Sequence, residues 1–184
     1  MVAEGLVQYL NRCQHIVTPS DSIKQMLETF GGLTERVTTI PTGIDLAPYQ
    51  AADGQVVRQK HNLNDHKVLI SIGRLAEEKN WITLLSAVAQ IAETHPEIRL
   101  IILGDGPQRE ALESYAQEVG LGEQVIFTGL VPFEDVPAYL KAGDIFCFAS
   151  TTETQGLVTM EALAAGLPVV AVDATGTRDA VVNG

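Results

Sequence analysis

Cysteine and aromatic side chains are scarce in this 184-residue sequence. It contains two cysteines, and aromatic residues make up 5% of the chain. Two cysteines cannot supply the several disulfides that hold many small secreted domains together, so a reducing cytoplasm is the expected setting. Cys147 lies in the apolar run 145–149, where we expect a buried and reduced thiol.

Basic residues are also few. The chain has 12 Lys and Arg against 23 Asp and Glu, which gives a formal net charge of −11 at pH 7. This acidity argues against a nucleic-acid partner and leaves no basic face for anionic lipids. The acidic residues are spread along the sequence, and solubility is their simplest role.

Long hydrophobic runs are missing as well. No apolar stretch approaches the ~20 residues that a membrane-spanning helix requires. We therefore expect no transmembrane segment, and any membrane contact of this segment to be peripheral. The hydrophobic content of 46% is nevertheless ample for the core of one domain, or of one domain and a piece of another.

Several motifs with known chemistry do not occur. The histidines show no metal-ligand spacing, and there is no HExxH or CxxC motif, so no metal site is expected. The sequence also lacks a GxGxxG dinucleotide fingerprint, a GxxxxGK[ST] phosphate loop and a GxSxG nucleophile elbow.

What the sequence does contain is an alternation of strand-like apolar runs and helical patterns. Strands are expected at 15–18, 36–40, 68–72, 99–103, 125–127, 145–149 and 167–172. Helices are expected at 20–30, 80–94, 108–119, 136–141, 157–165 and 177–182. This series predicts an α/β fold with a doubly wound parallel sheet. The loops after the strands that end at 72, 103, 127 and 149 should then meet at one crevice.

The segment 148–166, FASTTETQGLVTMEALAAG, places a glycine at the start of an expected helix. The first N–H groups of a helix are unpaired and carry partial positive charge, which suits an anion such as a diphosphate. Gly156 lets a ligand approach the backbone closely. The amides of Gly156, Leu157 and Val158 are therefore the expected donors to the anion.

Two carboxylates, Glu153 and Glu161, flank this helix start. Carboxylates repel phosphate, but they accept hydrogen bonds from hydroxyl groups. A ligand that offers a diphosphate and many hydroxyls together is a nucleotide sugar, and this is the predicted ligand. The alternative is that one glutamate caps the helix and the other is simply solvated.

The loop after the strand 68–72 carries two cations in a chain that has few. Gly73 permits close backbone approach, Arg74 can form paired hydrogen bonds with phosphate, and Lys79 supplies a compact charge. We predict that this loop binds phosphate. The alternative is that Glu77 and Glu78 neutralise both cations at the surface.

Two further turns follow strands and have more than one interpretation. Gly104-Asp105-Gly106-Pro107, taken alone, is best explained as a tight turn. The turn 128–132 either offers main-chain groups to the edge of a base or is an ordinary connection.

Together these motifs resemble the retaining group 1 glycosyltransferases, which form glycosyltransferase family four. The resemblance rests on 40–45 (IPTGID), Gly73-Arg74 with Lys79, 103–107 (LGDGP), 127–129 (FTG), and Glu153 with Glu161. It implies a GT-B fold, in which two Rossmann-like domains face each other across a cleft. It further implies that 1–42 is the end of an N-terminal acceptor domain, 43–66 an interdomain linker, and 67–184 the Rossmann-like donor-binding domain, truncated at its C-terminus.

The resemblance also implies a role for each matching residue. Arg74 and Lys79 would hold the donor diphosphate and stabilise the leaving group, and Glu153 would position the transferred sugar; these are the implied catalytic residues. Glu161 would bind the ribose hydroxyls, and Val131 the base through its main chain. The implied donor-binding set is Gly73, Arg74, Lys79, Val131, Glu153, Gly156, Leu157, Val158 and Glu161.

The implied reaction is metal-independent transfer of a hexose, from UDP-glucose, to a lipid or sugar hydroxyl with retention of configuration. No cofactor is expected besides the nucleotide-sugar substrate. The variant 152–156 (TETQG) is closest to diacylglycerol glucosyltransferases, which implies glycolipid synthesis at the inner face of the plasma membrane. The acceptor would be bound by the missing N-terminal half, so the fragment alone is expected to be inactive.

Two other functions remain open from the sequence. The first is a UDP-sugar epimerase of the same fold, which would need acid–base groups at the sugar beyond Glu153. The second is a non-catalytic nucleotide-binding module. The sequence argues against a pyridoxal-phosphate phosphorylase, because no lysine lies near the segment from Glu153 to Glu161 to form a Schiff base.

Overall fold

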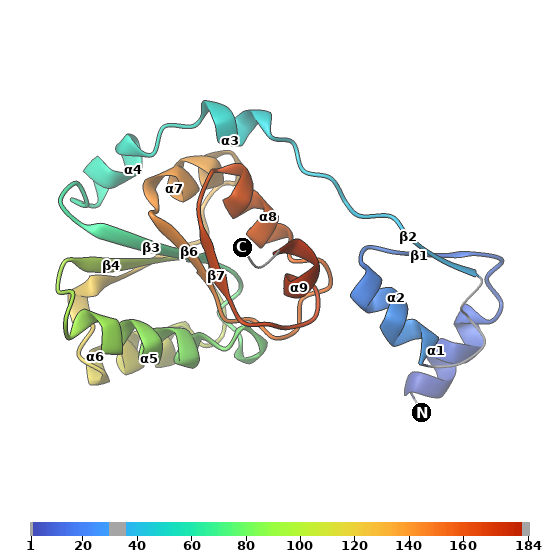
Figure 1. Ribbon diagram of the computed structural model, residues 1–184. Coiled ribbons are helices and arrows are strands. Elements are labelled where there is room, and N and C mark those ends of the chain that lie inside the picture. Colours follow the sequence, from blue (N-terminus) through green and yellow to red (C-terminus); the bar gives the residue numbers. More distant parts are fainter. Residues whose placement is uncertain (1, 30–35, 182–184) are drawn as a thin grey trace.

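The computed structural model describes residues 2–29 and 36–181, which form a small N-terminal unit and a larger α/β unit (Figure 1). The N-terminal unit contains α1 (Val2–Leu10), β1 (Ile16–Thr18), α2 (Asp21–Glu28) and β2 (Val37–Thr39). β1 and β2 pair in parallel, and α2 packs against both strands. An extended segment then leads to the larger unit (Figure 1).

The larger unit is built on a five-stranded parallel sheet. Its strands are β3 (Lys67–Ile72), β4 (Ile98–Leu103), β5 (Val125–Gly129), β6 (Ile145–Phe148) and β7 (Val169–Ala171). Their order across the sheet is β5-β4-β3-β6-β7. The chain therefore builds outward from β3 in one direction, returns to β6 on its other side, and continues outward. The doubly wound parallel sheet predicted from the sequence is confirmed, and the crevice between β3 and β6 is its topological switch point.

Helices cover both faces of this sheet (Figure 1). One face is packed by α5 (Trp81–Ala92) and α6 (Arg109–Glu118), and the other by α3 (Ala47–Ala51), α4 (Gln55–Lys60), α7 (Val136–Ala142) and α8 (Leu157–Ala164). Along β3 the side chains alternate, so that Val68 and Ile70 enter one hydrophobic cluster and Leu69 enters the other. The remaining elements are α9 (Thr177–Ala180) and the short 3-10 helices Glu77–Lys79, Gly122–Gln124 and Phe133–Asp135.

Most expected element boundaries are confirmed to within two residues. The strand expected at 167–172 is shorter, Val169–Ala171, because Pro168 has no N–H group to donate to a neighbouring strand. The helix expected at 20–30 begins after Ser20, whose Oγ accepts a hydrogen bond from the Ile23 amide, and ends at Glu28. Residues 30 and 182, the expected last residues of the helices 20–30 and 177–182, lie outside the described residues.

The segment 43–66 packs two helices on the larger unit as well as connecting the two units. Tyr49 and Val57 enter the core beside α7. The Arg58 guanidinium donates to the Ala142 carbonyl (2.9 Å) and to Asp144 Oδ2 (2.9 Å), and that oxygen also accepts from the Val68 amide (2.7 Å). These contacts tie α4 to the amino end of β3.

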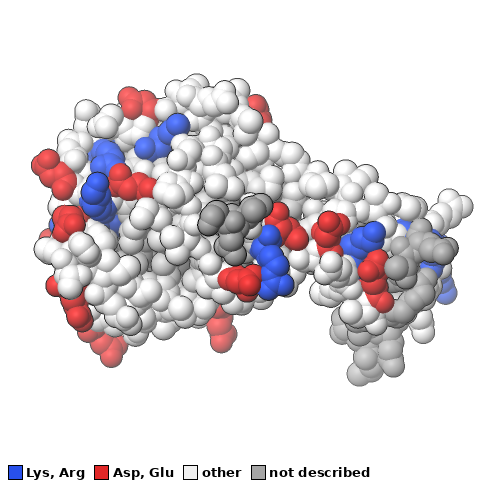
Figure 2. Space-filling model, in the orientation of Figure 1, with Lys and Arg blue, Asp and Glu red and all other residues white. Residues whose placement is uncertain are grey.

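Two sequence-based expectations concern the surface charge and the absence of a membrane-spanning helix. On the face shown in Figure 2, acidic side chains are scattered over the surface rather than gathered in one patch. Within 2–29 and 36–181, no helix is both long enough and apolar enough to cross a membrane.

A steric contact at Gly104 predicts a measurable loss of stability. Gly104 has φ +141°, and a Cβ there would lie 2.0 Å from the Gly73 carbonyl oxygen, where the loop after β3 crosses the end of β4. We expect Gly104→Ala to reduce the free energy of unfolding by about 1–3 kcal/mol beyond its backbone strain. Gly120→Ala is the matched control, because Gly120 also has a positive φ (+78°), but a Cβ there would meet no atom within 4 Å. Urea unfolding of both variants measures the difference, and equal losses would contradict the steric explanation.

Candidate functional site

An ion pair between Lys79 and Glu153 lies at the switch point of the sheet. Lys79 ends the 3-10 helix after β3, and Glu153 lies in the loop after β6. Lys79 Nζ is 2.5 Å from Glu153 Oε1, and Ser150 Oγ donates to the same oxygen at 2.7 Å. Only 20% and 16% of the two charged side chains are exposed, so both are largely removed from water. The alternative pairing of Lys79 with its neighbours in sequence is therefore wrong.

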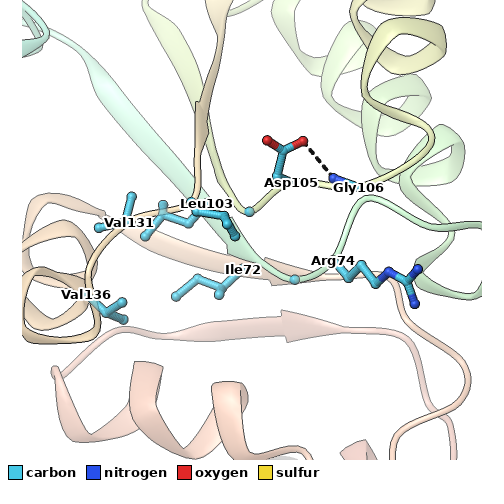
Figure 3. A pocket seen from close by; sticks show the side chains of 10 residues that line it. Ile72, Arg74, Leu103, Asp105, Gly106, Val131 and Val136 are labelled. Carbon is cyan, nitrogen blue, oxygen red and sulfur yellow. Dashed lines mark hydrogen bonds between the residues drawn. The ribbon is translucent and has the colours of Figure 1, made fainter.

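The first cavity, of about 690 Å³, opens at the carboxyl ends of β3, β4 and β5. The predicted convergence is thus confirmed for the loops after 72, 103 and 127, and the loop after 149 reaches the loop after β3 through the Lys79–Glu153 ion pair. Figure 3 shows Ile72, Leu103, Val131 and Val136 lying close together on one side of this cavity. The cavity wall is mainly apolar there, which suits a flat, weakly polar group such as a base.

Arg74 borders the same cavity, but its side chain extends away from the apolar wall (Figure 3). Its guanidinium is exposed and forms no ion pair within the described part of the chain. Its carbonyl accepts a hydrogen bond from Nε1 of the buried Trp81 (2.9 Å), which fixes the backbone of the loop.

The turn 104–107 (GDGP) packs against the loop after β3. The Leu75 amide donates to the Asp105 carbonyl (3.0 Å), and a Cβ at Gly106 would lie 2.5 Å from the Leu75 carbonyl oxygen. The Asp105 carboxylate accepts from the Gly106 amide at 2.7 Å (Figure 3). Glycine is needed because the two loops touch backbone to backbone.

The second cavity, of about 500 Å³, lies between α3 and the start of α8. Tyr49, Leu157 and Glu161 line it. Burial raises the pKa of Glu161, and the neighbouring Tyr49 hydroxyl partly offsets that rise. Burial and then the charge of Glu161 raise the pKa of Tyr49 to about 12. Both cavities border the segment 130–137.

The start of α8 offers unpaired backbone donors. Gly156 precedes the helix with φ +70° and no side chain caps it, which contradicts the alternative of a capping glutamate. The amides of Leu157 and Val158 have no acceptor among the described residues. A Cβ at Gly156 would be 3.0 Å from the Gly176 carbonyl oxygen, so the glycine also permits close packing against the segment before α9. This geometry is suited to an anion.

The structure thus distributes the sequence-predicted residues over three neighbouring places. Lys79 and Glu153 are in contact, and Gly73, Arg74 and Val131 border the first cavity. Leu157 and Glu161 border the second cavity, and Gly156, Leu157 and Val158 form the start of α8. Within the described ranges, no group of three or more His, Cys, Asp or Glu side chains is arranged to hold a metal ion.

Sequence reasoning missed Ser150 and Tyr49. Ser150 is buried and orients Glu153. Tyr49 lies on α3, a short helix in the segment 46–64, and lines the second cavity together with Glu161. Neither residue belongs to a motif, and only the fold brings them to the carboxylates.

Comparison with known proteins assigns the family. Residues 54–184 match the family described as Glycosyl transferases group 1. The chain belongs to this family. It is 34% identical over 182 residues to an alpha-monoglucosyldiacylglycerol synthase of Streptococcus pneumoniae, an alignment that covers 93% of this chain and 41% of that protein. It is 32% identical over 177 residues to a 2-deoxystreptamine glucosyltransferase of Streptomyces kanamyceticus, with 94% and 46% covered.

Solved structures agree with this assignment. The crystal structure of Anabaena Alr3699/HepE in complex with UDP and glucose superposes with a TM-score of 0.90 at 27% identity, and covers 99% of this chain and 51% of that one. The group 1 resemblance and the GT-B, Rossmann-like architecture inferred from the sequence are therefore confirmed. The chain spans about half, or less, of the length of these relatives.

Proposed function

We propose that this glycosyltransferase chain binds the nucleotide sugar for a retaining, metal-independent hexosyltransferase. In this proposal 1–42 ends the acceptor domain, 43–66 joins the two halves, and 67–184 holds the donor. The observation that carries the proposal is the Lys79–Glu153 ion pair at the switch point, beside the unpaired amides of α8. Lys79, the cation proposed to bind phosphate, and Glu153, the carboxylate proposed to bind sugar hydroxyls, are in direct contact there.

Each part of a UDP-linked hexose has a complementary surface in this arrangement. The diphosphate faces Lys79, the exposed guanidinium of Arg74 and the amides at the start of α8. The base rests against the apolar wall of the first cavity, with the main chain of Val131 at its edge. Glu161 accepts hydrogen bonds from the ribose hydroxyls, and Glu153 from the hydroxyls of the sugar.

In the proposed reaction the bond between the sugar anomeric carbon and the diphosphate oxygen breaks, and UDP leaves. The acceptor hydroxyl bonds to that carbon on the same face and passes its proton to the departing phosphate oxygen. Lys79 and Arg74 offset the negative charge that develops on UDP. Glu153 orients the sugar and does not attack it, since its Oε1 already binds Lys79 and Ser150.

The acceptor in this proposal is a lipid or sugar hydroxyl, held mainly by the N-terminal half of the enzyme. The relative from Streptococcus pneumoniae is named for a diacylglycerol-linked product, which supports a lipid acceptor. We accordingly place the reaction in glycolipid synthesis, at the cytoplasmic face of the membrane.

Isothermal titration of the 184-residue chain tests the donor assignment. We expect UDP and UDP-glucose to bind, and uridine to bind at least about 100-fold more weakly, because it lacks the diphosphate that forms charge-assisted hydrogen bonds. GDP carries the same diphosphate on a different base, so it is the control for the contribution of the base, which the first cavity receives. Equal affinities for uridine and UDP, or no binding of UDP at millimolar concentration, would contradict the proposal.

A further inference from the structure

Each residue of the loop 153–156 is held by a different part of the chain. These parts are the loop after β3, the turn before α2, the extended segment 40–46 and the segment before α9. The contacts are Lys79 with the Glu153 carboxylate (2.5 Å), Ser20 Oγ donating to the Thr154 carbonyl (2.6 Å), Gln155 Nε2 donating to the Thr42 carbonyl (2.9 Å), and Gly156 packed against Gly176.

Gln155 has no contact with the nucleotide sugar in the proposed function. Its residue is only 6% exposed, although its side chain is a polar amide. The amide donates to Thr42, which lies 113 residues earlier in the chain and begins the segment that lines the second cavity. Burying the Gln155 amide without an acceptor would cost free energy, so this bond fixes the position of the loop relative to the extended segment 40–46.

The consequence of this bond differs for the two carboxylates of the site. Glu153 lies two residues from Gln155 in the same irregular loop, so a shift of Gln155 displaces it from Lys79 and Ser150. Glu161 lies in the middle of α8, where the helix backbone holds it independently of the loop.

We infer that Gln155 is a positioning residue for the sugar part of the donor: by bonding to the Thr42 carbonyl it holds Glu153 where the sugar hydroxyls bind. The extended segment 40–46 thereby influences sugar binding through a side chain that does not touch the sugar. This inference rests on the proposed function, because it takes Glu153 to be the sugar contact.

The test compares the affinities of the 184-residue chain for UDP-glucose and for UDP after the amide is removed. Gln155→Met keeps the length and burial of the side chain but cannot donate a hydrogen bond. We expect UDP-glucose to bind about tenfold more weakly, the equivalent of one buried hydrogen bond, and UDP to lose no more than about threefold. Gln155→Ala should behave in the same way, with a lower unfolding temperature that reports the cavity it leaves.

Gln124→Met is the matched control. Its side-chain amide also donates to backbone carbonyls, those of Pro96 and Ile98, but at the far end of the sheet. Its affinities for both ligands should equal those of the wild type. If Gln155→Met folds cooperatively and either retains both affinities or loses them equally, the inference is overturned.

Hydrogen exchange separates this inference from the proposed function. Exchange of the amides of 153–158 in the unliganded chain should be faster in Gln155→Met than in the wild type, and unchanged in Gln124→Met. If the wild type binds neither ligand, the donor assignment fails, while faster exchange would still support the anchoring of the loop by Gln155. Unchanged exchange would overturn the anchoring whatever the ligands do.

Discussion

Lys79→Ala is expected to weaken UDP binding by about 10- to 100-fold. The proposed contact between the ammonium group and the diphosphate is charge-assisted, and such bonds contribute about 1.5–3 kcal/mol. The variant also leaves the largely buried Glu153 carboxylate without its cation, so the site becomes more repulsive towards phosphate. Lys79→Arg retains the charge and should recover part of the affinity.

Lys67→Ala is the control for the general effect of charge. Lys67 is exposed at the amino end of β3, the strand whose carboxyl end leads to Lys79, so the two variants change the net charge equally. Titration calorimetry at low and at moderate salt measures all three variants against the wild type. If Lys67→Ala loses as much affinity as Lys79→Ala, the effect is long-range electrostatics, and the ion pair is no phosphate site.

The sheet could be predicted from the sequence because its central strands are buried on both faces. The run 68–72 is continuously apolar, and β3 duly places Val68 and Ile70 in one core and Leu69 in the other. Once a parallel sheet is recognised, the carboxyl ends of its strands locate the crevice without further information. Lys79 and Glu153 follow strands that become neighbours, so their meeting was predictable in outline.

The partners of these residues could not be predicted, because they depend on contacts between distant segments. The segment 46–64 has no clear periodicity, yet its Tyr49 lines the second cavity together with Glu161, since Pro48 starts a short helix that packs against α7 and α8. The bond from Gln155 to Thr42 uses a backbone carbonyl, which leaves no trace in residue identity. The direction of Arg74, away from the apolar wall, is likewise a property of the folded loop.

Glu161→Gln is expected to stabilise the unliganded protein while it weakens donor binding. Burial raises the pKa of Glu161 above its ordinary value of 4.5, so ionisation of this carboxyl group lowers the free energy of unfolding. A raised pKa in the folded state means that the contribution of this group to stability is fully present below the ordinary pKa and is lost as the pH rises through the raised value. The uncharged glutamine avoids this loss, so the unfolding temperature of Glu161→Gln should exceed that of the wild type at pH 7.5, by an amount that shrinks towards pH 4.

Donor affinity should change in the opposite direction, because the ionised carboxylate is the better acceptor for the ribose hydroxyls. We expect Glu161→Gln to bind UDP-glucose about 10- to 100-fold more weakly at pH 7.5, and wild-type affinity to fall towards that of the variant as the pH drops through the raised pKa of Glu161. UDP-glucose is the appropriate ligand, because its diphosphate lacks the terminal group that titrates near pH 6 in UDP. Glu118→Gln removes the same charge from an exposed site on α6 and should change neither quantity. A Glu161→Gln variant that is less stable than the wild type at pH 7.5, or that binds UDP-glucose equally well, would show that Glu161 is retained for the fold and not for the ligand.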